Sequence, residues 1–146
     1  MRRRVADSIR HAVDDLVDAW ISAVRSDPRI HSDDGLTHGQ LRDEVPALLR
    51  EVADVVLDDE EPTAASLREG RVHVYTRFRQ GYRARDLVLE LSLLRLVLLD
   101  FLARVAAADA PTVHVGEFAA ISRIVNLYVD EEMRYAMTIY TESRDG

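Results

Sequence analysis

Apolar residues recur every three or four positions along most of this 146-residue chain, and no stretch of alternating β-branched residues interrupts them. This spacing places apolar side chains on one face of a helix, so the pattern predicts an all-α protein. Glycine and proline are rare, at 6 and 4 residues, and they fall between the periodic segments. A chain of this length forms one core, and we therefore expect a single domain over residues 1–146.

The pattern predicts five main helices, over approximately residues 3–26, 37–57, 63–80, 84–108 and 115–143. Thr37 and Gln40 have the spacing of a capping box at the start of the second. Pro46, inside the second segment, predicts either a kink or the start of a new helix with proline in its first turn. Gly81 stands where a left-handed residue would end the third helix. Little after Ile139 is apolar, so we expect the last helix to continue past the core.

One charged residue, Arg95, lies on the apolar side of the 84–108 helix. At about 100° per residue it falls among leucines, whereas other charged residues occupy a narrow opposite sector that we interpret as the solvated face. The leucines are Leu91, Leu94, Leu98, Leu99 and Leu102, and the opposite sector holds Asp86, Glu90, Asp100 and Arg104. A buried guanidinium cannot lose its charge, so it needs an acidic partner.

The 115–143 helix offers that partner, because Glu132 stands in the middle of its apolar stripe. We predict that Arg95 and Glu132 approach each other or share a polar network. Such a pair would fix the register of two helices, unless Arg95 extends to the protein edge instead. Alternatively, Arg95 would meet an anionic ligand in a small pocket.

Glu69, His73 and Arg77 are spaced by four and share one helix face. We interpret them as a ladder of charged side chains on a polar or half-buried face. His73 is also a candidate metal or haem ligand, or part of a partner-binding surface. However, no second histidine follows at three or four residues, and no H-E-x-x-H motif occurs. Trp20 lies in the apolar stripe of the first helix, which favours a place in the core over a cofactor platform.

Composition narrows the possible functions. The chain has no cysteine, which excludes disulfides, thiolate metal sites and cysteine nucleophiles. Its net charge of -7 argues against general nucleic-acid binding. No apolar run reaches the ~18 residues that a membrane-spanning helix needs, and no signal peptide is recognisable, so we expect a cytoplasmic protein. No nucleophile with a neighbouring base and no phosphate-binding loop appears, so we expect neither an enzyme nor a bound cofactor or metal.

The third and fourth segments carry a spaced pattern that resembles the N-terminal sensor domain of RsbR-type stressosome proteins, the RsbT co-antagonists. The same type of domain precedes some bacterial sensor histidine kinases. The pattern consists of His73, Arg77, Gly81-Tyr82, Asp86-Leu87, Glu90 and Arg95. Trp20 and the stretch LRDEVPALL at residues 41–49 are also similar to the family, and the resemblance extends from about Leu16 to Tyr140.

The resemblance implies a globin-like helical fold without haem, a homodimer, and transfer of a signal to an attached effector domain. The sequence ends at TESRDG without an effector, so it is either a piece of a longer protein or a stand-alone relative. We therefore expect a non-enzymatic regulatory sensor whose dimer buries apolar residues of the first and fifth helices. The alternative is a haem or small-ligand sensor that uses His73. The possible signalling or pocket residues are Trp20, His73, Arg77, Tyr82, Asp86, Glu90, Arg95 and Glu132.

Overall fold

The computed structural model describes residues 1–58, 61–108 and 114–145. Within these ranges all regular structure is helical, which confirms the all-α prediction. The elements in chain order are α1 (Arg2–His11), α2 (Val13–Ser26), α3 (His38–Arg42), α4 (Val45–Asp58), the 3₁₀ helix η1 (Ala64–Leu67), α5 (Arg68–Arg79), α6 (Ala84–Ala108) and α7 (Val115–Asp145). The globin-like arrangement of these helices stays a prediction.

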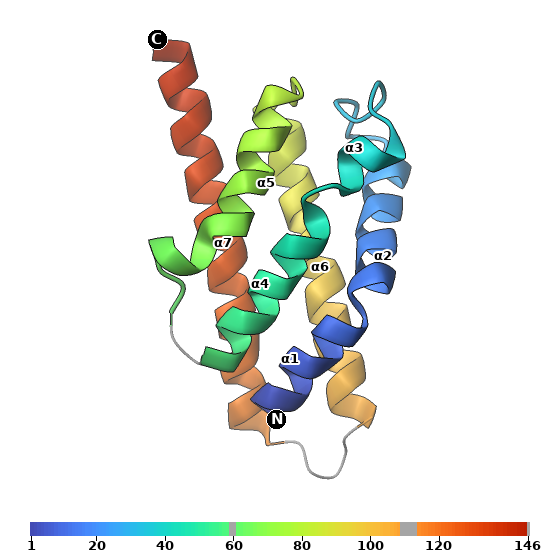
Figure 1. The fold of residues 1–146 in the computed structure, drawn as a ribbon, viewed down its shortest axis with the longest axis vertical. Helices are drawn as coiled ribbons and strands as arrows, with labels where there is room; N and C mark the ends of the chain where they lie inside the picture. Colours follow the sequence, from blue (N-terminus) through green and yellow to red (C-terminus); the bar gives the residue numbers. More distant parts are fainter. Residues whose placement is uncertain (59–60, 109–113, 146) are drawn as a thin grey trace.

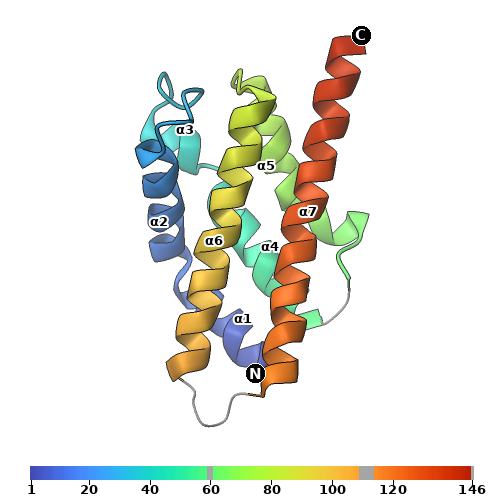
Figure 2. The ribbon, with the colours of Figure 1, turned by 180° about the vertical axis from the view of Figure 1, so that it is seen from behind.

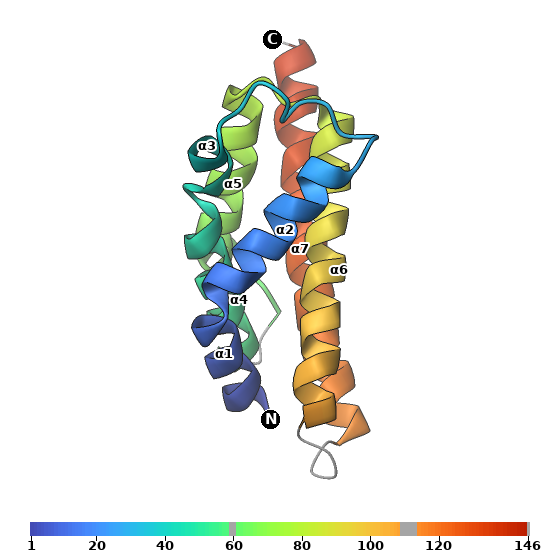
Figure 3. The same cartoon turned by 90° about the vertical axis from the view of Figure 1, so that its right-hand side faces the viewer.

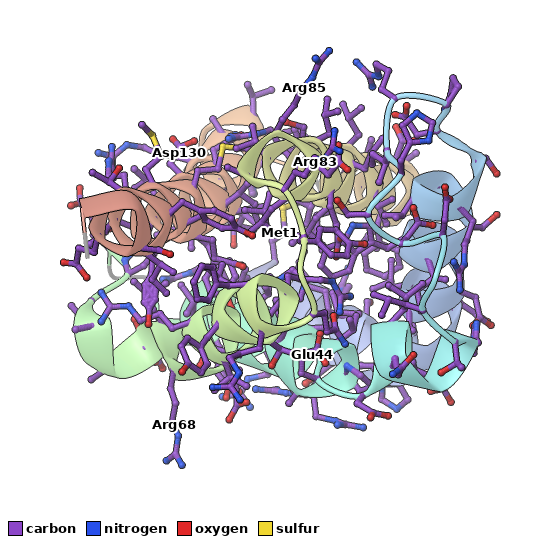
Figure 4. The ribbon with its side chains drawn as sticks, turned by 90° about the horizontal axis from the view of Figure 1, so that it is seen from above. Met1, Glu44, Arg68, Arg83, Arg85 and Asp130 are labelled. Atoms are coloured by element: carbon purple, nitrogen blue, oxygen red, sulfur yellow. The ribbon has the colours of Figure 1, made fainter. Side chains whose placement is uncertain are left out.

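The helices form two layers with the core between them. Figure 3 shows α1, α3, α4 and α5 in one layer and the antiparallel pair α6 and α7 in the other, while α2 crosses from the first layer towards the second. The view along the bundle in Figure 4 shows the same two layers, with Arg68 and Arg85 pointing away from the core on opposite sides. This arrangement brings one face of α5 against both α6 and α7.

Local sequence signals account for most helix ends. The Thr37 side chain accepts a hydrogen bond from the Gln40 amide, and the Gln40 side chain accepts one from the Thr37 amide, which confirms the predicted capping box. A short helix, α3, ends before Pro46, and α4 begins with Pro46 in its first turn, so the second of the two alternatives is correct. Gly81 has a φ of 84°, which confirms the left-handed residue after α5.

The first predicted helix is wrong in one respect, because the chain turns at Ala12 and forms two helices. Ala12 adopts φ −100° and ψ 12°, outside helical geometry. The apolar stripe continues across the break, with Ile9 and Val13 both buried, so periodicity gave no sign of it. The turn lets α1 pack against α4 while α2 packs against α6, which a single straight rod could not do.

The last helix, α7, is the longest element, at 31 residues. It runs the length of the bundle and projects beyond the neighbouring ends of α5 and α6 (Figures 1 and 2). Its outer part therefore extends past the core, as expected. Neither α7 nor any other helix of the described residues is long and apolar enough to cross a membrane.

α5 packs closely against α7 at Gly70. A Cβ atom added at this position would lie 2.8 Å from Tyr128 Oη and 3.0 Å from Glu132 Cδ. Such distances are shorter than normal van der Waals contact, so only glycine lets these two helices pack so tightly.

We expect Gly70→Ala to lower the free energy of unfolding by about 1–3 kcal/mol, because the added methyl group forces α5 and α7 apart. Urea unfolding of the variant and wild type measures this difference. Gly116→Ala is the matched control: Gly116 is also helical, but its Cβ would meet nothing within 4 Å. That control should be neutral or more stable by up to about 1 kcal/mol, and equal losses in both variants would contradict the packing argument.

Candidate functional site

A cluster of charged side chains lies inside the bundle where α5 faces α6 and α7. It consists of His73 and Arg77 from α5, Glu90 from α6, Glu132 from α7, and Glu44 from the segment before α4, and we call these five residues the buried charge network. All are at most 9% exposed. Charged side chains are almost never buried unless they are paired, so this network is the most unusual feature of the core.

Arg77 is the centre of the network. Its Nε donates to Glu90 Oε1 at 2.8 Å, its Nη1 donates to Gln80 Oε1 at 3.0 Å, and its Nη2 donates to the Leu41 carbonyl at 2.8 Å. Nη1 also lies 2.8 Å from Glu44 Oε1. Arg77 therefore joins α5 to α6, to α3 and to the start of α4, and its charge is balanced by two carboxylates.

His73, one turn earlier on α5, is placed between two carboxylates. Its Nε2 lies 2.9 Å from Glu90 Oε1, and its Nδ1 lies 3.5 Å from Glu132 Oε2. The ring is fully buried and packs against the Trp20 indole, with centroids 5.1 Å apart. The expected shared face of His73 and Arg77 is confirmed. These two side chains are fully buried, whereas Glu69, the third member of the predicted ladder, is half-buried.

The predicted pairing of Arg95 with Glu132 is wrong. Arg95 donates to Asn126 Oδ1 and to Asp130 Oδ1, both at 2.5 Å, and its side chain is 24% exposed. Glu132 is buried as expected, but it faces His73 on α5. The long Arg95 side chain turns to the outer side of the α6–α7 pair, where water and a half-exposed carboxylate solvate it.

The predicted solvated face of α6 is also wrong for Glu90 and Asp86, which are 1% and 4% exposed. Glu90 is the shared acceptor of Arg77 and His73. Asp86 accepts hydrogen bonds from the His31 amide, the Ser32 amide and the Ser32 hydroxyl, at 3.2, 2.9 and 2.5 Å. It therefore anchors the loop after α2 to the first turn of α6.

Trp20 and Tyr82 close the network on its remaining sides. Trp20 is 2% exposed, which confirms its predicted place in the core, and its Nε1 donates to the Glu90 carbonyl at 2.9 Å. The Tyr82 ring lies under the Arg77 guanidinium, at 5.4 Å from the ring centroid, in a cation–π contact. The Tyr82 carbonyl in turn accepts from Tyr140 Oη at 2.6 Å, which links the network to the outer part of α7.

Two parts of the site were not found from the sequence. Glu44, beside Arg77, precedes a helix and carries no periodicity signal. Glu51 accepts from the Glu69 and Gly70 amides at 2.8 and 3.0 Å and from Tyr128 Oη at 2.7 Å. Its carboxylate thus binds the N-terminus of α5, where helix amides lack partners. Only its position on an inward-facing turn of α4 could have suggested this role.

The pKa values of the two central carboxyl groups, Glu90 and Glu132, are shifted in opposite directions. Burial alone would raise the pKa of Glu90, but the Arg77 guanidinium and the His73 ring outweigh it and hold this pKa at about 2. Burial raises the pKa of Glu132, and His73 only partly opposes that rise. Burial would lower the pKa of His73, yet the carboxylates of Glu132 and Glu90 raise it to about 9. At neutral pH, His73 is therefore an imidazolium.

The network leaves no open coordination position for a haem iron, because each ring nitrogen of His73 faces a carboxylate. The cavity beside it, lined in part by Trp20, Arg77 and Glu90, has a volume of about 10 Å³. That is room for about one water molecule. Within the described residues, no group of three or more acidic or histidine side chains is placed to hold a metal ion.

These features define a helical domain organised around an internal charge network. The model of one protein family, the RsbT co-antagonist protein rsbRD N-terminal domain, matches residues 14–146. The match covers nearly the whole chain, and the chain belongs to this family, whose members are regulatory signalling domains of the stressosome type. No curated protein and no solved structure matches the chain.

We expect Arg77→Gln to cost about 3–5 kcal/mol of stability, because it leaves buried carboxylates without their cation. The matched control is Arg95→Gln, which removes a half-exposed arginine and should cost at most about 1 kcal/mol. Chemical denaturation of both variants gives the comparison. Equal losses of stability in the two variants would contradict the argument that burial makes Arg77 the more important of the two arginines.

We expect stability to fall on both sides of a maximum between about pH 5 and 6.5. The pKa of His73 in the folded state, about 9, exceeds its ordinary 6.5, so its contribution is fully present below pH 6.5 and is lost as the pH rises to 9. This interval corresponds to about 3 kcal/mol. The pKa of Glu90, at about 2, lies below its ordinary 4.5, so its contribution is lost as the pH falls from 4.5 to 2.

Denaturant unfolding at a series of pH values tests this profile. His73→Gln should flatten the alkaline side, because glutamine does not titrate. It should reduce the acid side without abolishing it, because Arg77 still lowers the pKa of Glu90 after the His73 charge is lost. An alkaline fall of the same size in this variant would show that another group causes it.

Proposed function

We propose that this chain is a non-enzymatic sensory and regulatory domain of a bacterial signal-transduction protein acting in the cytoplasm. In this proposal two copies form a homodimer, and α7 relays a change in their packing to a downstream effector domain. The effector would belong to a stressosome RsbR-like protein or a sensor histidine kinase. Membership of the RsbT co-antagonist family supports the signalling role, and the geometry of α7 supports the relay.

The observation that carries the proposal is the path of α7. This one helix contributes Glu132 to the buried charge network and then continues past the ends of α5 and α6 (Figure 2). A helix is stiff, so a small shift or rotation at Glu132 displaces the projecting end as well. Shifts of about 1–2 Å at subunit interfaces are a common means of transmitting signals between domains.

The outer face of the α6–α7 pair is the surface best suited to a second copy. No other helix covers it in Figure 2, and it exposes Leu96 at 60% and Met137 at 67%. On α6, apolar and small residues repeat at seven-residue intervals, the spacing of a coiled-coil seam. These residues are Leu89, Leu96 and Ala103 in one row and Ser92, Leu99 and Ala106 in the other.

This surface differs from the one expected from the sequence, which combined the first and fifth helices. The apolar residues of α1 and α2 lie in the core, and no large apolar side chain of these two helices is exposed. The proposal therefore keeps α7 and replaces the first helix by α6. The geometry does not favour the alternative of a haem or small-ligand sensor, since both ring nitrogens of His73 face carboxylates.

We expect Leu96→Asp to convert a dimer into a monomer, because it buries a charge at the centre of the proposed interface. Sedimentation of the wild type and variant at micromolar concentration measures this change. Val72→Asp on α5, at a residue that is 43% exposed but outside this surface, is the control and should remain dimeric. A monomeric wild type would contradict the proposed dimer.

The relay is tested by fusing the chain to a histidine kinase core through a helix that continues α7. Each residue inserted into this linker rotates the output domain by about 100° and moves it by about 1.5 Å. We expect kinase activity to vary with insertions of one to seven residues and to recover near seven, which completes about two turns. Activity that is indifferent to linker length would argue against transmission through α7.

A further inference from the structure

We propose that His73 and Glu132 form a proton-operated lock between α5 and α7, which is closed while the His73 ring carries its second proton and opens when alkaline pH removes it. The inference deepens the proposed function, since it names the event that would move α7. It rests on that function only for its biological meaning, because the lock itself is a property of the isolated chain.

The geometry of the pair points to a switch rather than to a permanent ion pair. Glu132 is 1% exposed, and neither of its carboxylate oxygens has a hydrogen-bond partner among the described residues. His73 Nδ1 also lacks a hydrogen bond, and it faces Glu132 Oε2 at 3.5 Å. Glu132 is thus held in the core almost entirely by the charge of one imidazolium. Pairs that serve packing alone usually have their remaining polar atoms satisfied.

The closest charged and phenolic neighbours of the pair keep their charge state while His73 loses its proton. Arg77 keeps its proton at every accessible pH, and Glu90 stays ionised beside Arg77 and His73. Burial raises the pKa of the Tyr82 and Tyr128 hydroxyl groups, so both stay neutral. The titratable and charged groups that face the pair are Glu44 and Glu51 from the α4 side, Glu69 and Arg77 from α5, Tyr82 and Glu90 from the α6 side, and Tyr128 from α7.

The proposed step is a simple deprotonation. One of the two N–H bonds of the His73 ring breaks, the proton passes to hydroxide in the solvent, and the electron pair remains on that ring nitrogen. The net charge of the His73–Glu132 pair falls by one unit. The Glu132 carboxylate then has no cation beside it, and an unpaired buried charge costs several kcal/mol. The carbonyls and carboxylates nearby cannot replace the lost proton.

The close packing at Gly70 converts this cost into movement. A Cβ atom on Gly70 would lie only 3.0 Å from Glu132 Cδ, and Glu132 is 1% exposed, so this packing of α5 against α7 keeps water from the carboxylate. Hydration of Glu132 therefore requires α7 to move away from α5. The same movement strains the hydrogen bond from Tyr140 to the Tyr82 carbonyl, which holds the outer part of α7. The pKa of His73, raised to about 9, places the step above neutral pH.

Two measurements on the purified full chain test the lock. NMR titration of the His73 ring should give a pKa well above the ordinary 6.5, and Glu132→Gln should lower it by about one unit or more because the facing negative charge is removed. A pair of spin labels reports the helices: the chain has no native cysteine, so Val72→Cys on α5 and Thr138→Cys on α7 give unique sites. Their separation should increase by about 1–2 Å between pH 7 and pH 10.

In the labelled protein, Glu132→Gln should abolish the change in separation, since no unpaired carboxylate remains at this position after His73 is deprotonated. Glu131→Gln is the matched control: Glu131 is adjacent in sequence but pairs with exposed Arg134, so both the titration and the movement should persist. If Glu132→Gln fails to fold, His73→Gln replaces it and should also show no step between pH 7 and pH 10.

A His73 ring that titrates near 6.5 in the wild type, or a separation that stays constant between pH 7 and pH 10, would overturn the lock. So would movement that survives Glu132→Gln. These results are independent of the linker experiment. If the pH-dependent movement is found but kinase activity does not depend on linker length, the relay is wrong and the lock stands. If activity depends on linker length but no movement is found, the lock is wrong and the relay stands.

Discussion

The fold depends on the burial of a charge that cannot be neutralised. Arg77 is 1% exposed and permanently cationic, so the helices around it must supply acceptors and keep them in place. Glu90 from α6, the Leu41 carbonyl from α3 and Gln80 from the end of α5 meet this need. A domain is stable by only about 5–15 kcal/mol, and breaking one buried pair costs about 3–5. The register of α3, α5 and α6 is therefore fixed by this network as much as by apolar packing.

The sequence predicted the helices much better than the site. The 84–108 helix, the capping box at Thr37 and the left-handed Gly81 follow from short-range rules, and the structure agrees with them. The turn at Ala12 could not be predicted, because apolar residues continue on both sides with unbroken spacing. Whether one long helix or two shorter helices pack better depends on where α4 and α6 lie in the fold. The spacing of apolar residues in the sequence does not contain that information.

The assignment of helix faces failed for a related reason. Nearly every third or fourth residue of α6 is a leucine, so its apolar side is broad, and the charged residues decided the predicted orientation. Asp86 and Glu90 were placed in solvent because they are acidic, and Arg95 was placed inside by exclusion. The opposite holds, because the loop after α2 and the α5 helix supply donors to the two acids. A helical projection cannot show partners on another helix, whereas the spacing of His73 and Arg77 lies within one helix and was predicted correctly.

The two central carboxylates of the buried charge network differ in their hydrogen bonds, and this difference is relevant to the role of the network. Glu90 accepts from both Arg77 and His73 at Oε1, although its Oε2 has no hydrogen bond, while Glu132, equally buried, has no hydrogen bond at either oxygen. An ion pair that only fixed register would be better served by two satisfied carboxylates, because each unsatisfied buried oxygen costs free energy. The member with no hydrogen bond at either oxygen belongs to α7, the helix that projects beyond the bundle, and it lies where α7 packs against Gly70 of α5. Glu132, the carboxylate of the network with the fewest hydrogen bonds, is thus located on α7, the helix whose movement would displace the projecting end of the domain.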